Sequence, residues 1–235
     1  MTDNKKLLVF IHGWGVSSKI FEPLFYYLKN NFNIHTLDLP GFGKTPIEKA
    51  MTLKDYADFV YKFLEDNKIE KPIVIGHSFG GAVTAKLALL YPDSILKLIL
   101  VDASAIRQPR RKMILLEKIM PILKPIAVGK LKQLIIKLLK FDKTDWSQIR
   151  NPELKKTFQN VIAENLKPSL PGIKSPTLVI WGEKDKITPI ADGKLIAESI
   201  PGAKFAVIKN VGHFVFLEKP EEFVKLIKNF ANDAD

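Results

Sequence analysis

The chain has no cysteine among its 235 residues and only four histidines, His12, His35, His77 and His213. The lack of cysteine excludes disulfides, thiolate metal sites, iron–sulfur ligation and a cysteine nucleophile. With so few histidines, a multi-histidine metal site is not expected either. The sequence therefore predicts neither a metal nor another cofactor.

Long apolar runs are also missing. No stretch approaches the roughly 18 consecutive apolar residues of a membrane span. The first apolar run, residues 7–11, is too short for a signal-peptide core and follows a polar start. We therefore expect a cytoplasmic protein. Its length suits one domain of about 200–250 residues, or a core domain with an insertion.

Acidic residues are outnumbered, and the excess positive charge is concentrated in one segment. The formal net charge is +11, with +1 in residues 1–104, +10 in residues 105–170 and zero in residues 171–235. A basic segment can attract an anionic membrane surface or an acidic protein such as an acyl carrier protein, or it can simply be solvated. No recognition motif supports nucleic acid as a partner.

Short apolar runs alternate with amphipathic helical patterns. The runs lack polar alternation, as strands buried on both faces of a parallel sheet do. The predicted strands are residues 7–11, 33–38, 72–75, 96–101, 177–181 and 204–208. The predicted helices are residues 19–30, 53–67, 79–91, 190–199 and 220–231. This alternation predicts an α/β fold with a mostly parallel sheet of about six strands.

Residues 105–170 break this rhythm, because they contain basic helical patterns and no convincing strand. We predict a core formed by residues 1–104 and 171–235, with a basic helical insertion at 105–170.

The strongest motif is Gly-His-Ser-Phe-Gly-Gly at residues 76–81, which follows a predicted strand and opens a predicted helix. The G-x-S-x-G pattern is typical of a nucleophile elbow, a turn so sharp that the serine adopts strained backbone angles. Residues two before and two after the serine must be small, and Gly76 and Gly80 meet that need. A glycine-rich turn with an incidental serine is the alternative, but the context favours Ser78 as a nucleophile.

A serine hydroxyl is a weak nucleophile and needs a base that a third group orients. His213, after the last predicted strand, is the predicted base. The other histidines fit this role less well. His35 lies within a strand, His12 precedes a glycine at a strand–loop junction, and His77 points away from its neighbour on the turn.

Asp185 follows the preceding strand and completes the chain order Ser…Asp…His, which is the order in α/β-hydrolases. Asp102 is its rival, because it also ends a strand, although capping of the following loop would explain it equally simply. Glu183 is better explained as a solvated surface residue. The order favours Asp185 as the acid that orients His213.

A tetrahedral intermediate needs two N–H donors. The backbone N–H of Phe79, directly after the serine, is one predicted donor. Trp14, in His-Gly-Trp-Gly at residues 12–15, is the other, because the flanking glycines allow a close backbone approach. Trp14, Phe79 and Phe214 are the predicted substrate contacts.

Together these motifs resemble the α/β-hydrolase superfamily over nearly the whole core, including Asp-Leu-Pro-Gly-Phe-Gly at residues 38–43. His-Gly-Trp-Gly is similar to the motif of pimeloyl-acyl-carrier-protein methyl ester esterases. Gly-His-Ser-Phe-Gly-Gly is shared more widely, with carboxylesterases and with hydrolases of carbon–carbon bonds. A serine nucleophile disfavours the dehalogenase and epoxide hydrolase branches, which use aspartate.

The resemblance implies a sheet in the order 2-1-3-4-5-6, numbered along this chain, because two N-terminal strands usual in the family are missing. The switch in strand order then falls between the first and third strands, which carry Trp14 and Ser78 at the edge of the sheet where ligands bind. The strand at residues 33–38 becomes an edge, either covered by a partner chain or exposed.

The insertion is expected to lie over the C-terminal ends of the strands as a lid, as in similar hydrolases. Residues 130–141 form an amphipathic pattern, either a lid helix packed on the core or an interfacial helix on an anionic surface. The densest basic cluster is Arg107, Arg110, Arg111 and Lys112. Apolar residues between 115 and 123 fit an acyl pocket or the core of the lid.

The sequence therefore predicts a serine hydrolase that cleaves a carboxylic ester with an apolar acyl part through an acyl-enzyme. A carbon–carbon bond hydrolase of the same fold is the enzymatic alternative. A binding module for an anionic membrane or acidic carrier, with an inactive hydrolase core, is the alternative of another class.

Overall fold

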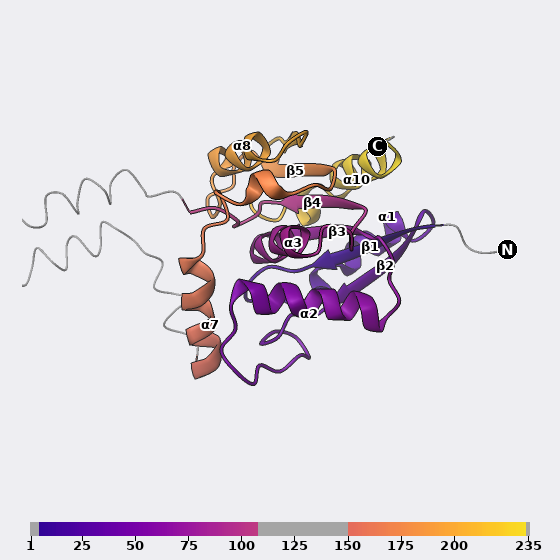
Figure 1. The fold of residues 1–235 in the computed structure, drawn as a ribbon. Coiled ribbons are helices and arrows are strands. Elements are labelled where there is room, and N and C mark those ends of the chain that lie inside the picture. Colours follow the sequence, from indigo (N-terminus) through magenta and orange to yellow (C-terminus); the bar gives the residue numbers. More distant parts are fainter. Residues whose placement is uncertain (1–4, 108–149, 234–235) are drawn as a thin grey trace, which may run out of the picture.

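The computed structural model describes residues 5–107 and 150–233 (Figure 1). Six strands form one sheet in the order β2-β1-β3-β4-β5-β6, and every neighbouring pair is parallel. They are β1 (Lys6–Ile11), β2 (Phe32–Leu37), β3 (Ile73–His77), β4 (Lys97–Val101), β5 (Thr177–Gly182) and β6 (Lys204–Ile208). The predicted fold class and strand order are confirmed.

The burial of each strand accounts for the pattern of apolar residues in its sequence. Every residue of the central strands β3, β4 and β5 is buried, whereas most residues of the edge strands β2 and β6 are only partly buried. Strands covered on both faces do not alternate between apolar and polar residues, which is why these central strands are mostly apolar.

Helices cover both faces of the sheet (Figure 1). They are α1 (Glu22–Leu28), α2 (Leu53–Asp66), α3 (Phe79–Leu90), α7 (Pro152–Ala163), α8 (Ile190–Ser199), α9 (Val215–Glu218) and α10 (Pro220–Asn232). The predicted helix at 19–30 is instead a 3-10 turn, Ser18–Phe21, followed by α1, because Pro23 sits in the first turn of α1 and begins a new helix.

Local signals set the ends of the other helices near the predicted positions. Thr52 and Asp55 form a capping box in which each side chain accepts the other's backbone N–H. The helix α3 ends at Leu90, just before Tyr91 and Pro92.

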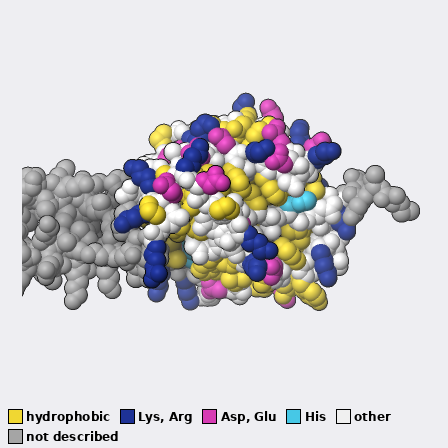
Figure 2. Space-filling view, turned by 90° about the horizontal axis from the view of Figure 1, so that it is seen from below, with side chains coloured by type: hydrophobic (Ala, Val, Ile, Leu, Met, Phe, Trp, Pro, Cys, Tyr) yellow, Lys and Arg dark blue, Asp and Glu magenta, His cyan; other side chains and the backbone are white. Residues whose placement is uncertain are grey.

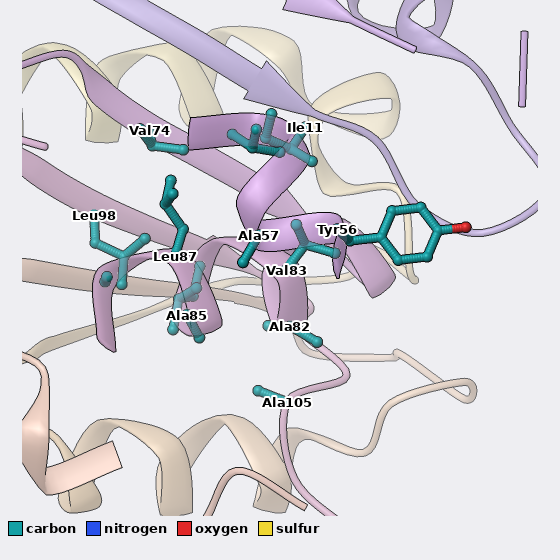
Figure 3. Close-up of a cluster of buried hydrophobic side chains, with 14 of the residues drawn as sticks. Ile11, Tyr56, Ala57, Val74, Ala82, Val83, Ala85, Leu87, Leu98 and Ala105 are labelled. Atoms are coloured by element: carbon teal, nitrogen blue, oxygen red, sulfur yellow. The ribbon is translucent and has the colours of Figure 1, made fainter. Parts of the chain in front are cut away.

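One core layer fixes the position of β3 and α3, which flank Ser78. Ile11, Val74 and Leu98, from three strands, belong to the same buried cluster as Leu87 of α3 (Figure 3). Tyr56 of α2 lies at the side of this cluster, where its hydroxyl donates a hydrogen bond of 2.8 Å to the Pro40 carbonyl. The turn that carries Ser78 therefore rests on a close-packed base.

Helix α7, within the predicted insertion, packs against the core. The Met51 N–H donates to Thr157 Oγ1 at 2.8 Å, and Asn160 Nδ2 donates to the Met51 carbonyl at 3.1 Å. At the end of α7, the guanidinium of Arg107 donates to the carbonyls of Val161 and Ile162. These contacts hold α7 beside the loops that follow β2 and β4.

The division at residues 104 and 171 stays a prediction. The predicted helix at 130–141, the basic residues Arg110, Arg111 and Lys112 and the apolar residues at 115–123 lie outside the described residues.

Lys, Arg, Asp and Glu side chains are interspersed on the face of the described chain shown in Figure 2. Within residues 5–107 and 150–233, no helix combines the length and apolar character needed to cross a bilayer.

Candidate active site

Ser78 occupies the turn between β3 and α3 in a conformation that few residues adopt. Its φ is 54° and its ψ is −115°, which is strained for any residue with a side chain. Its N–H donates to the Val101 carbonyl at 2.9 Å, and its own carbonyl accepts from the Ser104 N–H at 2.9 Å. The neighbouring strand and loop therefore hold the strained turn in place, as a nucleophile elbow requires.

The glycine two residues before Ser78 has no room for a side chain. A Cβ atom on Gly76 would lie 2.3 Å from Thr84 Oγ1 and 2.5 Å from the Gly80 carbonyl oxygen. Both distances are far below van der Waals contact. A larger residue at position 76 would therefore collide with its neighbours, as the motif predicted.

His213 and Asp185 form a buried pair, with His213 Nδ1 and Asp185 Oδ2 2.7 Å apart. The other oxygen, Oδ1, accepts the backbone N–H groups of Ile187 and Thr188. Burial alone would raise the pKa of Asp185, but hydrogen bonds from His213, Thr188 and Ile187 outweigh it and lower the pKa. The carboxylate is therefore ionised at neutral pH and can hold the proton of His213 on Nδ1.

His77 links this pair to the serine turn. Its Nε2 lies 2.8 Å from the His213 carbonyl, and the two imidazole centroids are 4.7 Å apart. Burial lowers the pKa of His77 to about 3, so the ring is neutral and its Nε2–H donates this bond. The residue next to Ser78 is thus tied directly to His213, a contact that the sequence did not suggest.

Thr188 is a site residue that sequence reasoning missed. Its Oγ1 donates to Asp185 Oδ2 at 2.6 Å and lies 3.3 Å from His213 Nδ1. The Asp-x-x-Thr spacing was a usable signal, because aspartate commonly accepts hydrogen bonds from the backbone two or three residues later. Thr188 thus helps fix the rotamer of the acid.

Replacing Thr188 by valine, which keeps the shape and removes the hydroxyl, is expected to lower kcat/KM about tenfold or more, because one hydrogen bond to a charged group is lost. The lost bond normally lowers the pKa of Asp185, so that pKa should rise in the variant. Activity should then disappear at a higher pH on the acid side of the profile. A pH profile of kcat/KM identical to that of the wild type would contradict this role.

The loop after β1 approaches the serine closely. A Cβ atom on Gly13 would lie 3.2 Å from Ser78 Cβ. His12 shapes this loop, because its Nδ1 lies 2.8 Å from the Gly13 carbonyl while its Nε2 accepts the Leu39 N–H at 3.0 Å. Burial lowers the pKa of His12, which keeps the ring neutral for both bonds. The next residue, Trp14, is thereby placed beside the elbow.

Ser78 opens onto a cavity of about 660 Å³. The predicted contacts Trp14 and Phe79 both line it, and their rings are 5.3 Å apart. Its other lining residues are Ser104, Ile106, Arg107, Phe158, Val161, Ile162, Ile187, Thr188, Pro189, Ala191 and Asp192. The wall is mostly apolar, and α7 supplies part of it.

Two residues considered in the sequence are not among the described residues that line this cavity. Phe214, a predicted substrate contact, is not among the described residues that line it, and its ring packs 5.2 Å from that of His77. Asp102 is fully buried at the end of β4, and its Oδ1 accepts the Gly182 N–H at 2.8 Å.

Potential ligand atoms of His77, Asp102 and His213 lie within 4.8 Å of one another. Ring nitrogens of both histidines already take part in the bonds above, so we assign this cluster to the His213 site.

Comparison with known proteins agrees with this architecture. The sequence model of the alpha/beta hydrolase fold matches residues 6–148 and 137–220. The chain belongs to the α/β-hydrolase family. Among solved structures of this family, a hydrolase from Pseudomonas aeruginosa superposes with a TM-score of 0.75 at 25% identity, covering 98% of this chain and 91% of that chain.

Curated proteins that resemble the chain over nearly its whole length are named as esterases. The pimeloyl-[acyl-carrier protein] methyl ester esterase of Aeromonas hydrophila is 27% identical, over 95% of this chain and 94% of its own length. The enzyme of the same name from Wigglesworthia glossinidia brevipalpis is 28% identical, over 95% and 92%. The chain is thus an α/β-hydrolase whose named relatives are enzymes.

Proposed function

We propose that this α/β-hydrolase is a serine esterase that cleaves a carboxylic ester through an acyl-enzyme. One observation carries the proposal. A serine held at a strained elbow lines a mostly apolar cavity, and a buried His213–Asp185 pair is tied to the residue beside that serine. These are the parts that nucleophilic acyl transfer needs.

In the first half of the reaction, Ser78 Oγ attacks the ester carbonyl while His213 Nε2 takes the hydroxyl proton. Asp185, bonded to Nδ1, stabilises the resulting imidazolium. The backbone N–H groups of Phe79 and Trp14 are the proposed donors to the oxyanion. His213 then returns the proton to the departing alcohol oxygen, which leaves an ester between the acyl group and Ser78.

In the second half, water attacks the acyl-enzyme while His213 takes one of its protons. Collapse of the second tetrahedral intermediate breaks the bond to Ser78, and the proton returns to Oγ. The carboxylic acid leaves and the enzyme is regenerated.

Because its wall is mostly apolar, we expect the cavity to bind an apolar acyl group of the substrate. A series of p-nitrophenyl esters of increasing chain length tests this directly. We expect kcat/KM to rise with chain length until the cavity is full. Absence of ester turnover at every length, with cleavage of a dienone ring-fission product, would favour the carbon–carbon bond hydrolase instead.

A variant at the cavity wall sharpens this test. Ala191, exposed in the first turn of α8, lines the cavity, whereas Lys194 is exposed on the same helix and is not among the lining residues. Ala191→Trp is expected to reduce kcat/KM for long esters about tenfold relative to acetate, and Lys194→Trp should leave the ratio unchanged. Equal effects of the two variants would contradict the assignment of this cavity to the acyl chain.

The basic segment suggests how a large substrate could arrive. Residues 105–170 carry +10 of the net charge of +11, and the relatives above are named for a substrate on an acyl carrier protein. We propose that this charge attracts an acidic carrier protein. Hydrolysis of an acyl-carrier-bound ester should then weaken strongly between 50 and 500 mM salt, while p-nitrophenyl acetate should not. Salt-sensitive activation by anionic vesicles would point to a membrane surface instead.

A further inference from the structure

The imidazole of His77 lies where three parts of the candidate site meet. His77 is the last residue of β3 and directly precedes Ser78, and its side chain is buried. A Cβ atom on Gly13 would lie 3.1 Å from its Nδ1, so the ring lies against the loop after β1. Its Nε2 lies 2.8 Å from the His213 carbonyl oxygen. The ring therefore connects the serine turn, the proposed oxyanion loop and the loop of the proposed base.

The bond from His77 differs from another bond that holds the loop of His213. This loop lies between β6 and α9. The Gly212 N–H donates to both carboxylate oxygens of Glu218, at 3.0 and 3.1 Å, which fixes the loop to α9. The bond from His77 instead joins the backbone of His213 to the strand that ends next to Ser78. It is therefore placed to set the position of the base relative to the nucleophile.

We propose that His77 is a positioning residue of this site, which fixes the backbone of His213 relative to Ser78 by donating a hydrogen bond from Nε2. The inference rests on the proposed serine esterase. Proton transfer requires the base to lie about 2.6–3.2 Å from the hydroxyl, and a shift of about 1 Å can cost a hundredfold in rate. His77 acts through the backbone of His213 and takes up no proton in the reaction.

The surroundings of the ring place its proton on Nε2. Burial, helped by the charge that His213 can carry, lowers the pKa of His77 to about 3, so the ring is neutral and has one N–H. Nδ1 is buried with no hydrogen-bond partner among the described residues, whereas Nε2 faces a carbonyl oxygen. An N–H on Nδ1 would be buried and unpaired, which is costly. A neutral ring also avoids repelling the imidazolium that forms on His213.

The test compares two variants that separate the hydrogen bond from the packing of the ring. His77→Gln keeps an N–H donor and loses the ring, whereas His77→Phe keeps a ring and loses the donor. We expect His77→Phe to lower kcat for a p-nitrophenyl ester about tenfold or more with KM within about threefold, because the buried His213 carbonyl loses its donor. His77→Gln should recover most of the lost kcat.

A packing role predicts the opposite order, because glutamine cannot fill the space of a ring. His77→Gln no more active than His77→Phe, or a change in KM alone, would overturn the proposal. Phe214→Leu is the control, because it removes a ring that packs 5.2 Å from His77 and leaves the hydrogen bond intact. Turnover that persists in Ser78→Ala would instead overturn the esterase itself, so the two failures are distinguishable.

Nitrogen-15 NMR of the wild-type protein gives a reading that does not depend on whether the variants fold. His77 should keep a proton on Nε2 and a bare Nδ1 between about pH 5 and 8, because its pKa lies far below this range. His12 provides the contrast, because its Nε2 accepts the Leu39 N–H and its proton lies on Nδ1. A His77 proton on Nδ1, or titration of the ring within this range, would overturn the proposal.

Discussion

Replacing Ser78 by alanine is expected to lower kcat/KM for a p-nitrophenyl ester by about four to six orders of magnitude, because the acyl-enzyme can no longer form. The fold should persist, because the strained turn is held by backbone hydrogen bonds to Val101 and Ser104 that alanine retains. Steady-state kinetics and circular dichroism of the purified variant provide the two readings.

Ser104→Ala is the matched control. Ser104 lines the same cavity and contacts the elbow through its backbone N–H, so loss of its hydroxyl should change kcat/KM only a few-fold. If Ser78→Ala keeps a rate close to that of Ser104→Ala, the nucleophile lies elsewhere.

His213→Ala is expected to cost nearly as much as Ser78→Ala, and the double variant should be no worse than either single one. A nucleophile and its base act as a unit, so removing the second after the first loses little more. Kinetics of the three variants, at matched concentrations and at pH 7 to 8, measure this non-additivity.

Multiplicative losses would mean that Ser78 and His213 contribute separately, contrary to a shared proton transfer. Phe214→Leu is a useful comparison, because Phe214 neighbours His213 in sequence but packs against His77 and is not among the described residues that line the cavity. It should retain most of the wild-type kcat/KM.

Much of the fold could be read from local sequence, for reasons the structure makes plain. The central strands are mostly apolar because all of their residues are buried, and α2 begins where Thr52 and Asp55 cap it. The elbow around Ser78 was visible because Gly76 has no space for a Cβ atom. Each of these signals arises from residues close together in the sequence or from burial of a whole strand.

The features of the site that the sequence did not predict depend on contacts between segments that are distant in the chain. The bond from His77 to the His213 carbonyl joins residues 136 positions apart. Burial, together with the charge of Asp185 in another loop, raises the pKa of Asp102 to about 9. The sequence placed Asp102 at the end of a strand, but it could not show a second carboxyl facing the same histidine. Such convergence is set by strand order and loop packing rather than by local pattern.

The central claim is that Ser78 is the nucleophile of this α/β-hydrolase, and covalent labelling with a fluorophosphonate probe tests it most directly. After proteolysis and mass spectrometry, the account predicts a single phosphonylated peptide that contains Ser78, and no labelling of Ser78→Ala. Labelling that persists in Ser78→Ala, or that falls on another residue of the wild type, would contradict it.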